Sequence, residues 1–327
     1  MAVELHRRIE QHLGVSIPWE EFPGLTTSRF ATLVLDHLTA LPSASPQPTR
    51  VESPQPRSVP VRSKPEPIDA KGTKSLPSNP WIFSSTSNSQ ATIRLFCLPY
   101  AGAGASIFRT WTEELPPEIE VCPIQLPGRE DRLGETPFTR IAPLVKTLAP
   151  ILEPYLDISF AFFGHSMGAL VGFELIRELR RQGCPTPTRL FVSASRAPQM
   201  TDLTLPIHHL PEPKFLEALK RFQGTPDTIL QNADLMKLLL PILRGDLAIA
   251  ENYIYSAEER LHCPITAFGG ERDLMVSPED MAGWQDQTQQ SFNLHLYPSD
   301  HFFLHRDRTA LLQAIAKELT PVLSLKS

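Results

Sequence analysis

From about residue 92 onward, short apolar runs alternate with longer stretches of helical periodicity. Six short runs, bounded by proline, glycine or polar residues, are typical of buried strands; they fall at 93–98, 120–124, 158–163, 189–193, 264–268 and 292–297. Helical patterns lie between most of them, at 141–154, 169–183 and 278–290. Strands that alternate with helices predict an α/β fold, with a mostly parallel sheet flanked by helices.

One long segment, about 198–255, breaks this alternation with one helical pattern after another. An insertion of this size at the carboxyl edge of a sheet is where a lid over a binding site is expected, because functional segments gather on the loops of a rigid scaffold.

The chain before this domain consists of two segments that differ in composition. Residues 1–40 predict a short helical piece, because Leu5, Ile9 and Leu13 recur at four-residue spacing. Residues 41–80 contain ten prolines and seven serines, a composition that cannot offset its ordering entropy by burial. We therefore expect a helical segment at 1–40, a flexible linker at 41–90 and one larger α/β domain at 91–327.

Composition narrows the class of protein. The protein has a net charge of −5, so its overall charge does not attract anionic partners such as nucleic acids or anionic membranes. We therefore expect neither a nucleic-acid nor a membrane partner. The sequence has no secretory h-region and no apolar run of the ~20 residues that a membrane span needs, which predicts a soluble, cytoplasmic protein. Four scattered cysteines lack metal-ligand spacing and predict reduced, buried thiols and no metal site; they are Cys97, Cys122, Cys184 and Cys263.

The pentapeptide at 164–168, Gly-His-Ser-Met-Gly, fits the pattern G-x-S-x-G. The pattern is common by chance, but here an expected strand precedes it and an expected helix follows, which is the context of a nucleophile elbow. Ser166 is therefore the candidate nucleophile. The alternative is a glycine-rich strand-to-helix turn that presents a serine without a catalytic role to solvent.

A serine nucleophile needs a base and a carboxylate that orients the base. In folds that carry a nucleophile elbow, the acid follows the serine along the chain and the histidine follows the acid. Asp273 follows an apolar run and two glycines, and we prefer it to Glu271 because the loop must pass the glycine turn before a side chain can reach back. His301 lies in the loop after the last expected strand. His295 lies within that strand, and His305 lies a turn later.

An oxyanion hole in this arrangement uses the backbone N–H after the nucleophile and one from the loop after an early strand. These positions are Met167 and, in the small-residue loop 99–105, Ala101. A phosphate-binding turn is the rival interpretation of this loop, but the third glycine and the Lys-Ser/Thr pair of such motifs are missing.

With these residues in place, 90–327 resembles a type II thioesterase of polyketide and non-ribosomal peptide assembly lines. The matching stretches are Leu-Pro-Tyr-Ala-Gly at 98–102, Leu-Pro-Gly-Arg-Glu at 126–130, the elbow, the lid stretch 238–244, and Asp-His-Phe-Phe-Leu at 300–304. The resemblance implies an α/β-hydrolase fold and a catalytic triad of Ser166, Asp273 and His301. Two departures from the family pattern stand beside the triad: Leu274 replaces a proline, and Asp300 replaces a glycine. Asp300 could raise the basicity of His301 or compete with Asp273 for it.

Residues 1–40 resemble the second half of an acyl carrier domain. The serine that would carry phosphopantetheine falls before residue 1, so the segment is either a trimmed end or a relic.

The resemblance implies hydrolysis of acyl groups from phosphopantetheine arms of acyl- or peptidyl-carrier domains, without a cofactor. Apolar lid residues would cover an acyl chamber or serve only helix packing; they are Leu235, Met236, Leu239 and Leu243. Three alternatives remain: a terminal product-releasing thioesterase, a lipase or carboxylesterase, and a non-catalytic docking domain.

Overall fold

The computed structural model describes residues 79–83, 88–200, 205–222, 224–225 and 227–324. The expected helical piece at 1–40 and most of the expected linker at 41–90 lie outside the described residues. The domain that carries the motifs is described almost throughout.

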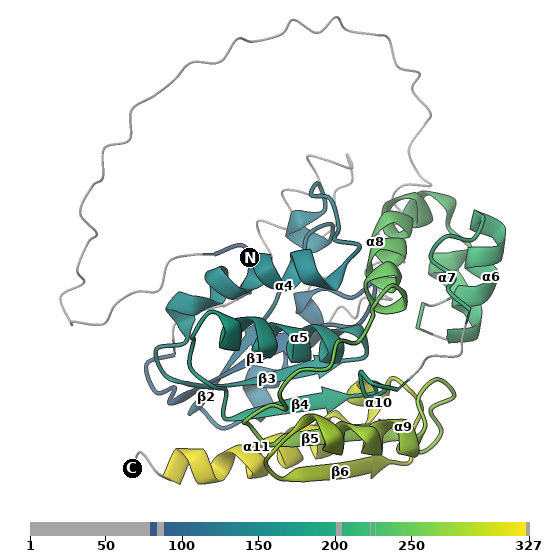
Figure 1. Cartoon of the computed structure of the whole chain (residues 1–327). Coiled ribbons are helices and arrows are strands. Elements are labelled where there is room, and N and C mark those ends of the chain that lie inside the picture. Colours follow the sequence, from purple (N-terminus) through teal and green to yellow (C-terminus); the bar gives the residue numbers. More distant parts are fainter. Residues whose placement is uncertain (1–78, 84–87, 201–204, 223, 226, 325–327) are drawn as a thin grey trace, which may run out of the picture. The chain divides into compact units, whose positions relative to one another are not determined.

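The described residues form a six-stranded parallel sheet in the order β2-β1-β3-β4-β5-β6 (Figure 1). The strands are β1 (Ile93–Leu98), β2 (Ile119–Pro123), β3 (Ser159–His165), β4 (Arg189–Ser193), β5 (Ile265–Gly270) and β6 (Phe292–Tyr297). Every expected strand is present, which confirms the predicted fold class. β3 and β5 extend two residues beyond their predicted ends because His165 pairs with Ser193 and Gly270 with Tyr297 in the ladder.

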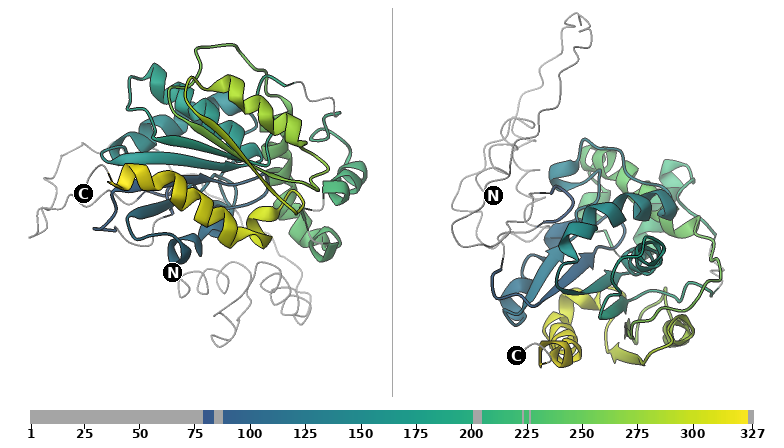
Figure 2. Two further views of the ribbon diagram at one scale, coloured as in Figure 1. Left: turned by 90° about the horizontal axis from the view of Figure 1, so that it is seen from below. Right: turned by 60° about the vertical axis from the view of Figure 1, so that its left-hand side comes forward.

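Helices cover both faces of the sheet, as the alternating pattern predicts. α4 (Ile141–Leu152), α5 (Met167–Arg181) and α9 (Pro278–Ala282) pack in the core of one face. α3 (Trp111–Glu114) and α11 (Arg308–Ser324) pack in the core of the other, which Figure 2 shows from below. The remaining helices are α6 (Glu212–Phe222), α7 (Asp227–Leu230), α8 (Ala233–Glu251) and α10 (Phe303–Arg306), with short 3-10 turns at Ala105–Phe108, Glu130–Arg132, Glu153–Tyr155 and Gly283–Gln287.

The expected helix at 278–290 is shorter than predicted. It is α-helical only to Ala282, continues as a 3-10 helix to Gln287 and then becomes extended. Thr288 explains the change, because its hydroxyl donates to the carbonyl of Cys263 at 2.7 Å and its backbone pairs with Leu261. This pairing ahead of β5 is not visible in the local sequence pattern.

The insertion at 198–255 is helical, as predicted, and α6 and α8 lie beside the carboxyl ends of the strands (Figure 1). α8 has two unlike halves around Pro241. Most of its buried residues follow that proline, and Met236 is the buried residue that precedes it. Of the apolar lid set, Met236 and Leu243 are buried, while Leu235 and Leu239 are half-buried.

Part of the expected linker belongs to the core instead. Trp81 and Ile82 are buried, and Ile82 forms a β-bridge with Ile124. The backbone N–H of Gln125 donates to Trp81 O at 2.8 Å, and the guanidinium of Arg132 lies 4.0 Å from the centre of the Trp81 ring. The proline- and serine-rich composition extends up to these residues, which concealed their packing.

All four cysteines are free, and three of them are buried as predicted. Cys184 is partly exposed, in contrast to the expectation. None of the helices in the described part of the chain is long and apolar enough to cross a membrane.

Candidate active site

Ser166 lies at the turn from β3 into α5, with φ of +53° and ψ of −119°. This backbone conformation is rare for a residue with a side chain and indicates a strained turn that the surrounding structure enforces. The backbone N–H of Ser166 donates to Ser193 O at 2.7 Å, which ties the turn to β4. The Ser166 side chain makes no capping hydrogen bond to α5. These features are those of a nucleophile elbow.

Both glycines of the motif are required by close backbone contacts. A Cβ at Gly164 would lie 2.2 Å from Gly168 O, and one at Gly168 would lie 2.3 Å from Leu98 O. These contacts place the first turn of α5 directly against the loop that follows β1. The sequence motif therefore reflects a packing constraint at two of its five positions.

Met167 is the first residue of α5 and is buried. The N–H groups in the first turn of a helix have no partner within the helix, and together they favour negative charge. The Met167 N–H is thus available at the position where an oxyanion would develop.

His301 and Asp273 are brought together from two loops at the carboxyl ends of β6 and β5. His301 Nδ1 and Asp273 Oδ2 are 2.7 Å apart, and the two side chains are 7% and 1% exposed. The other carboxylate oxygen, Oδ1, accepts the backbone N–H groups of Met275 at 2.8 Å and Val276 at 3.2 Å. Both carboxylate oxygens of Asp273 are therefore engaged, which fixes the imidazole of His301 in orientation.

A close approach of the two loops makes this pairing possible. A Cβ at Gly270 would lie 2.5 Å from Ser299 O, so only glycine permits the loop after β5 to pass so near the loop after β6. This contact supports the prediction that the acid follows the glycine turn. Glu271 is exposed at the start of this loop.

Asp300 does not compete for His301. Its Oδ1 accepts the backbone N–H of Phe302 at 3.0 Å, and its Oδ2 forms an ion pair with Arg306 at 2.8 Å near the surface. Of the two acids, Asp273 is the one whose carboxylate contacts the imidazole of His301.

His165, which sequence reasoning did not single out, links the elbow to His301. Its ring is fully buried with its centre 5.3 Å from that of His301, and its Nδ1 is 2.8 Å from Ser193 Oγ. Burial, and then the charges of His301 and His305, lower the pKa of His165 well below its ordinary value of 6.5. A neutral imidazole therefore lies beside His301. The hydrogen bonds of the described residues do not include one between Ser166 Oγ and His301, and such bonds are often long in free enzymes.

The loop after β1 is held by residues that no motif predicted as functional. The backbone N–H of Gly102, which has φ of +83°, donates to Asp246 Oδ2 at 2.7 Å. Asp246 in turn forms a buried ion pair with Arg129 at 2.6 Å. Ala101, the expected second oxyanion donor, is the residue before Gly102. A carboxylate within the apolar pattern of α8 was the one available signal for Asp246.

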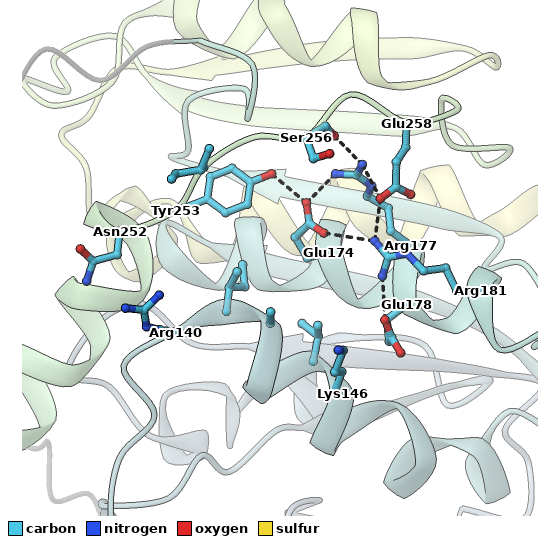
Figure 3. Close-up of a pocket in the computed structure, with 14 residues that line it drawn as sticks. Arg140, Lys146, Glu174, Arg177, Glu178, Arg181, Asn252, Tyr253, Ser256 and Glu258 are labelled. Atoms are coloured by element: carbon cyan, nitrogen blue, oxygen red, sulfur yellow. Dashed lines mark hydrogen bonds and ion pairs between the residues drawn. The ribbon is translucent and has the colours of Figure 1, made fainter.

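A cavity of about 320 Å³ lies between α4, α5 and the chain that follows α8 (Figure 3). Several charged groups in its lining are paired: Glu174 accepts Arg177 Nη1 at 2.6 Å and the Tyr253 hydroxyl at 2.7 Å. Glu174 follows Ser166 by eight residues of α5, a rise of about 12 Å along the helix. The cavity is therefore distinct from the candidate active site.

A comparison with known families identifies the domain. The family model described as "Thioesterase domain" matches residues 93–319, more than half of the chain. The chain belongs to the thioesterase domain family. It is a thioester hydrolase, of the serine type that this fold supports, and the predicted resemblance to type II thioesterases is confirmed.

This thioesterase is similar to several curated proteins and solved structures. It is 44% identical to the gramicidin S biosynthesis protein GrsT of Aneurinibacillus migulanus, over 76% of this chain and 97% of that protein. It is 37% identical to the thioesterase PikA5 of Streptomyces venezuelae, over 69% and 80% of the two chains. The type II thioesterase BorB from the borrelidin biosynthetic cluster matches with a TM-score of 0.67 and 33% identity, over 75% and 98% of the chains.

Proposed function

We propose that this thioesterase hydrolyses acyl groups from the phosphopantetheine arms of carrier proteins in polyketide or non-ribosomal peptide biosynthesis. Ser166 is the nucleophile, His301 the general base and Asp273 the group that orients His301. The observation that carries the proposal is the combination of the strained elbow at Ser166 with the buried His301–Asp273 hydrogen bond of 2.7 Å.

The chemistry follows from these roles. His301 takes the proton of the Ser166 hydroxyl as its oxygen attacks the thioester carbonyl. The N–H groups of Met167 and Ala101 donate to the oxyanion of the tetrahedral intermediate. The C–S bond breaks, and the pantetheine sulfur leaves with the proton from His301. Water, deprotonated by His301, then cleaves the acyl-enzyme, which releases the carboxylic acid and restores Ser166.

Similar proteins support the carrier-borne substrate. The name of GrsT places that protein in gramicidin S biosynthesis, and BorB is a type II thioesterase from the borrelidin biosynthetic cluster. We extend this context to the present chain, with acyl- or peptidyl-carrier domains as its partners. In this proposal the lid helix α8 borders the acyl group, and its half-buried Leu235 and Leu239 contact the chain of the substrate.

The test is hydrolysis of an acyl-pantetheine panel, presented on carriers and as free mimics, by the wild type and Ser166→Ala. We expect loss of at least ~10³-fold in kcat/KM for the variant, the scale of removing a triad nucleophile. A fluorophosphonate should label the wild type at Ser166 and leave the variant unlabelled. Equal inertness of both proteins towards every thioester, without labelling, would contradict the proposal and favour a docking domain.

The same panel separates the alternatives within the enzyme class. Faster turnover of short, stalled acyl chains indicates editing, whereas preference for a full-length chain indicates product release. Faster turnover of oxygen esters than of any carrier thioester would identify an esterase instead.

A further inference from the structure

Asp246 is a buried carboxylate on α8 whose two oxygens both contact segments outside that helix. Oδ1 accepts Arg129 Nη2 at 2.7 Å, and Oδ2 accepts Arg129 Nη1 at 2.6 Å. Oδ2 also accepts the backbone N–H of Gly102 at 2.7 Å. The side chains of Asp246 and Arg129 are 1% and 4% exposed. Apolar side chains of similar volume can replace such a pair without loss of stability, but they would leave the Gly102 N–H without an acceptor.

Gly102 is held by α8 at a second point. A Cβ at Gly102 would lie 2.6 Å from Leu243 Cδ2, so the loop touches the helix one turn before Asp246. The φ of Gly102 is +83°, a left-handed conformation that glycine adopts without penalty. Arg129 adds a third tie, because its Nη1 donates to Ala103 O at 3.0 Å.

The other end of the same loop is held by α5. Gly168 approaches so closely that an added Cβ would lie 2.3 Å from Leu98 O and 2.7 Å from Pro99 O. Ala101 thus lies in a short stretch that is fixed on one side by the nucleophile helix and on the other by Asp246. The peptide planes of the Ala101 and Gly102 N–H groups are related only by φ and ψ of Ala101, so orienting the Gly102 N–H restricts the direction of the Ala101 N–H.

We propose that Asp246 is a positioning residue, which fixes the Ala101 N–H for the oxyanion through its hydrogen bond to Gly102, while Arg129 neutralises its charge. The inference rests on the proposed function, because Ala101 is one of its two oxyanion donors. Removing an oxyanion donor typically lowers kcat by about 10²- to 10³-fold. Loss of the carboxylate oxygen displaces the donor without deleting it, so the expected loss is smaller.

Two matched double variants separate positioning from packing. Arg129→Met with Asp246→Leu removes both charges and the acceptor of the Gly102 N–H. Arg129→Met with Asp246→Asn removes both charges but keeps an oxygen acceptor, and Leu and Asn have similar branching at this position. We expect kcat of the Leu double variant to fall by about 10- to 100-fold with KM changed by less than about 3-fold. The Asn double variant should keep most of the wild-type kcat.

A control and a second measurement complete the test. Glu174→Gln alters another buried ion pair, on α5 beside the cavity between α4 and α5 (Figure 3), and should leave kcat unchanged. Equal kcat in the Leu and Asn double variants, in an active and folded protein, overturns the inference while the proposed function stands. Inertness of the wild type defeats the proposed function itself.

If the Leu double variant does not fold, amide hydrogen exchange in the wild type tests whether the Gly102 N–H is held in a stable hydrogen bond. The Gly102 amide should then be strongly protected, and exchange at the rate of an open loop overturns the inference.

Discussion

At the scale of single residues, His165 is the group whose environment most clearly predicts a dependence of folding stability on pH. Its pKa is lowered well below 6.5 by burial and then by the charges of His301 and His305. An unfolded histidine takes up a proton below about pH 6.5, whereas the folded chain keeps His165 neutral. The unfolded state therefore binds more protons in acid, so this contribution to stability is present above about pH 6.5 and is lost as the pH falls.

We expect His165→Asn to flatten the acid limb of the stability curve. The slope should decrease by up to about 1.4 kcal/mol per pH unit below pH 6.5, as measured by urea unfolding at a series of pH values. Asn can retain a hydrogen bond to Ser193, which limits other losses. His209→Asn, at an exposed histidine, provides the reference, and an identical slope in the two variants would refute the assignment.

The same scale shows what sequence could and could not foresee. The prediction of Ser166, Asp273 and His301 as candidates rests on motif, chain order and strand ends, since each lies within four residues of the end of a strand. Asp246 could not be found in this way, because its partner Gly102 is 144 residues away and no local pattern relates them. His165 was hidden for another reason: it stands at a free position of the elbow motif, and only the tertiary fold sets its ring beside His301.

At the scale of elements, the two halves of α8 differ in how firmly they pack against the domain. The residues after Pro241 pack into the core through Ile242, Ile249 and the small Gly245, where a Cβ would lie 2.9 Å from Phe138 O. The residues before Pro241 are mostly exposed or half-buried. A proline inside a helix also removes the hydrogen bond to the carbonyl four residues earlier, here that of Lys237. Helix α8 is thus least firmly held in its first half.

Hydrogen exchange should reveal this division. We expect amides at 235–240 to exchange much faster than those at 242–250, because local opening of the first half exposes little apolar surface. Pro241→Ala restores the missing hydrogen bond and a better helix former, so it should slow exchange in the first half and leave the second half unchanged. Uniform exchange along α8 in the wild type would show that the helix moves as one body.

Sequence periodicity predicted the strands more accurately than the helix at 278–290. Strand positions were predicted to within two residues, because short apolar runs in a parallel sheet are buried on both faces. The helix expected at 278–290 was overextended because the pairing of Thr288 with Leu261 depends on a distant segment. Long-range pairing overrides local pattern there.

At the scale of the whole molecule, the packed domain begins earlier than composition suggests. Trp81 and Ile82 belong to the buried cluster that contains residues of α4, together with Ile124 and Leu126. The ring of Trp81 also lies 4.0 Å from the guanidinium of Arg132. The first residues after the proline- and serine-rich stretch therefore contribute to the stability of the thioesterase domain, although the family match begins only at residue 93.

Two truncations test where the domain begins. A chain that starts at residue 75 keeps Trp81 and Ile82, and we expect its kcat towards a free pantetheine thioester to equal that of the full chain. A chain that starts at residue 88 loses both side chains and leaves the bridge to Ile124 unmade. Burial of one large apolar side chain contributes about 1.5 to 3 kcal/mol, so the free energy of unfolding should drop by about this amount or more. Trp81→Ala in the longer chain should reproduce most of the drop, which would assign it to lost packing and not to shortening. Equal stability of the two truncations would show instead that the core is complete without these residues and that the domain begins at β1.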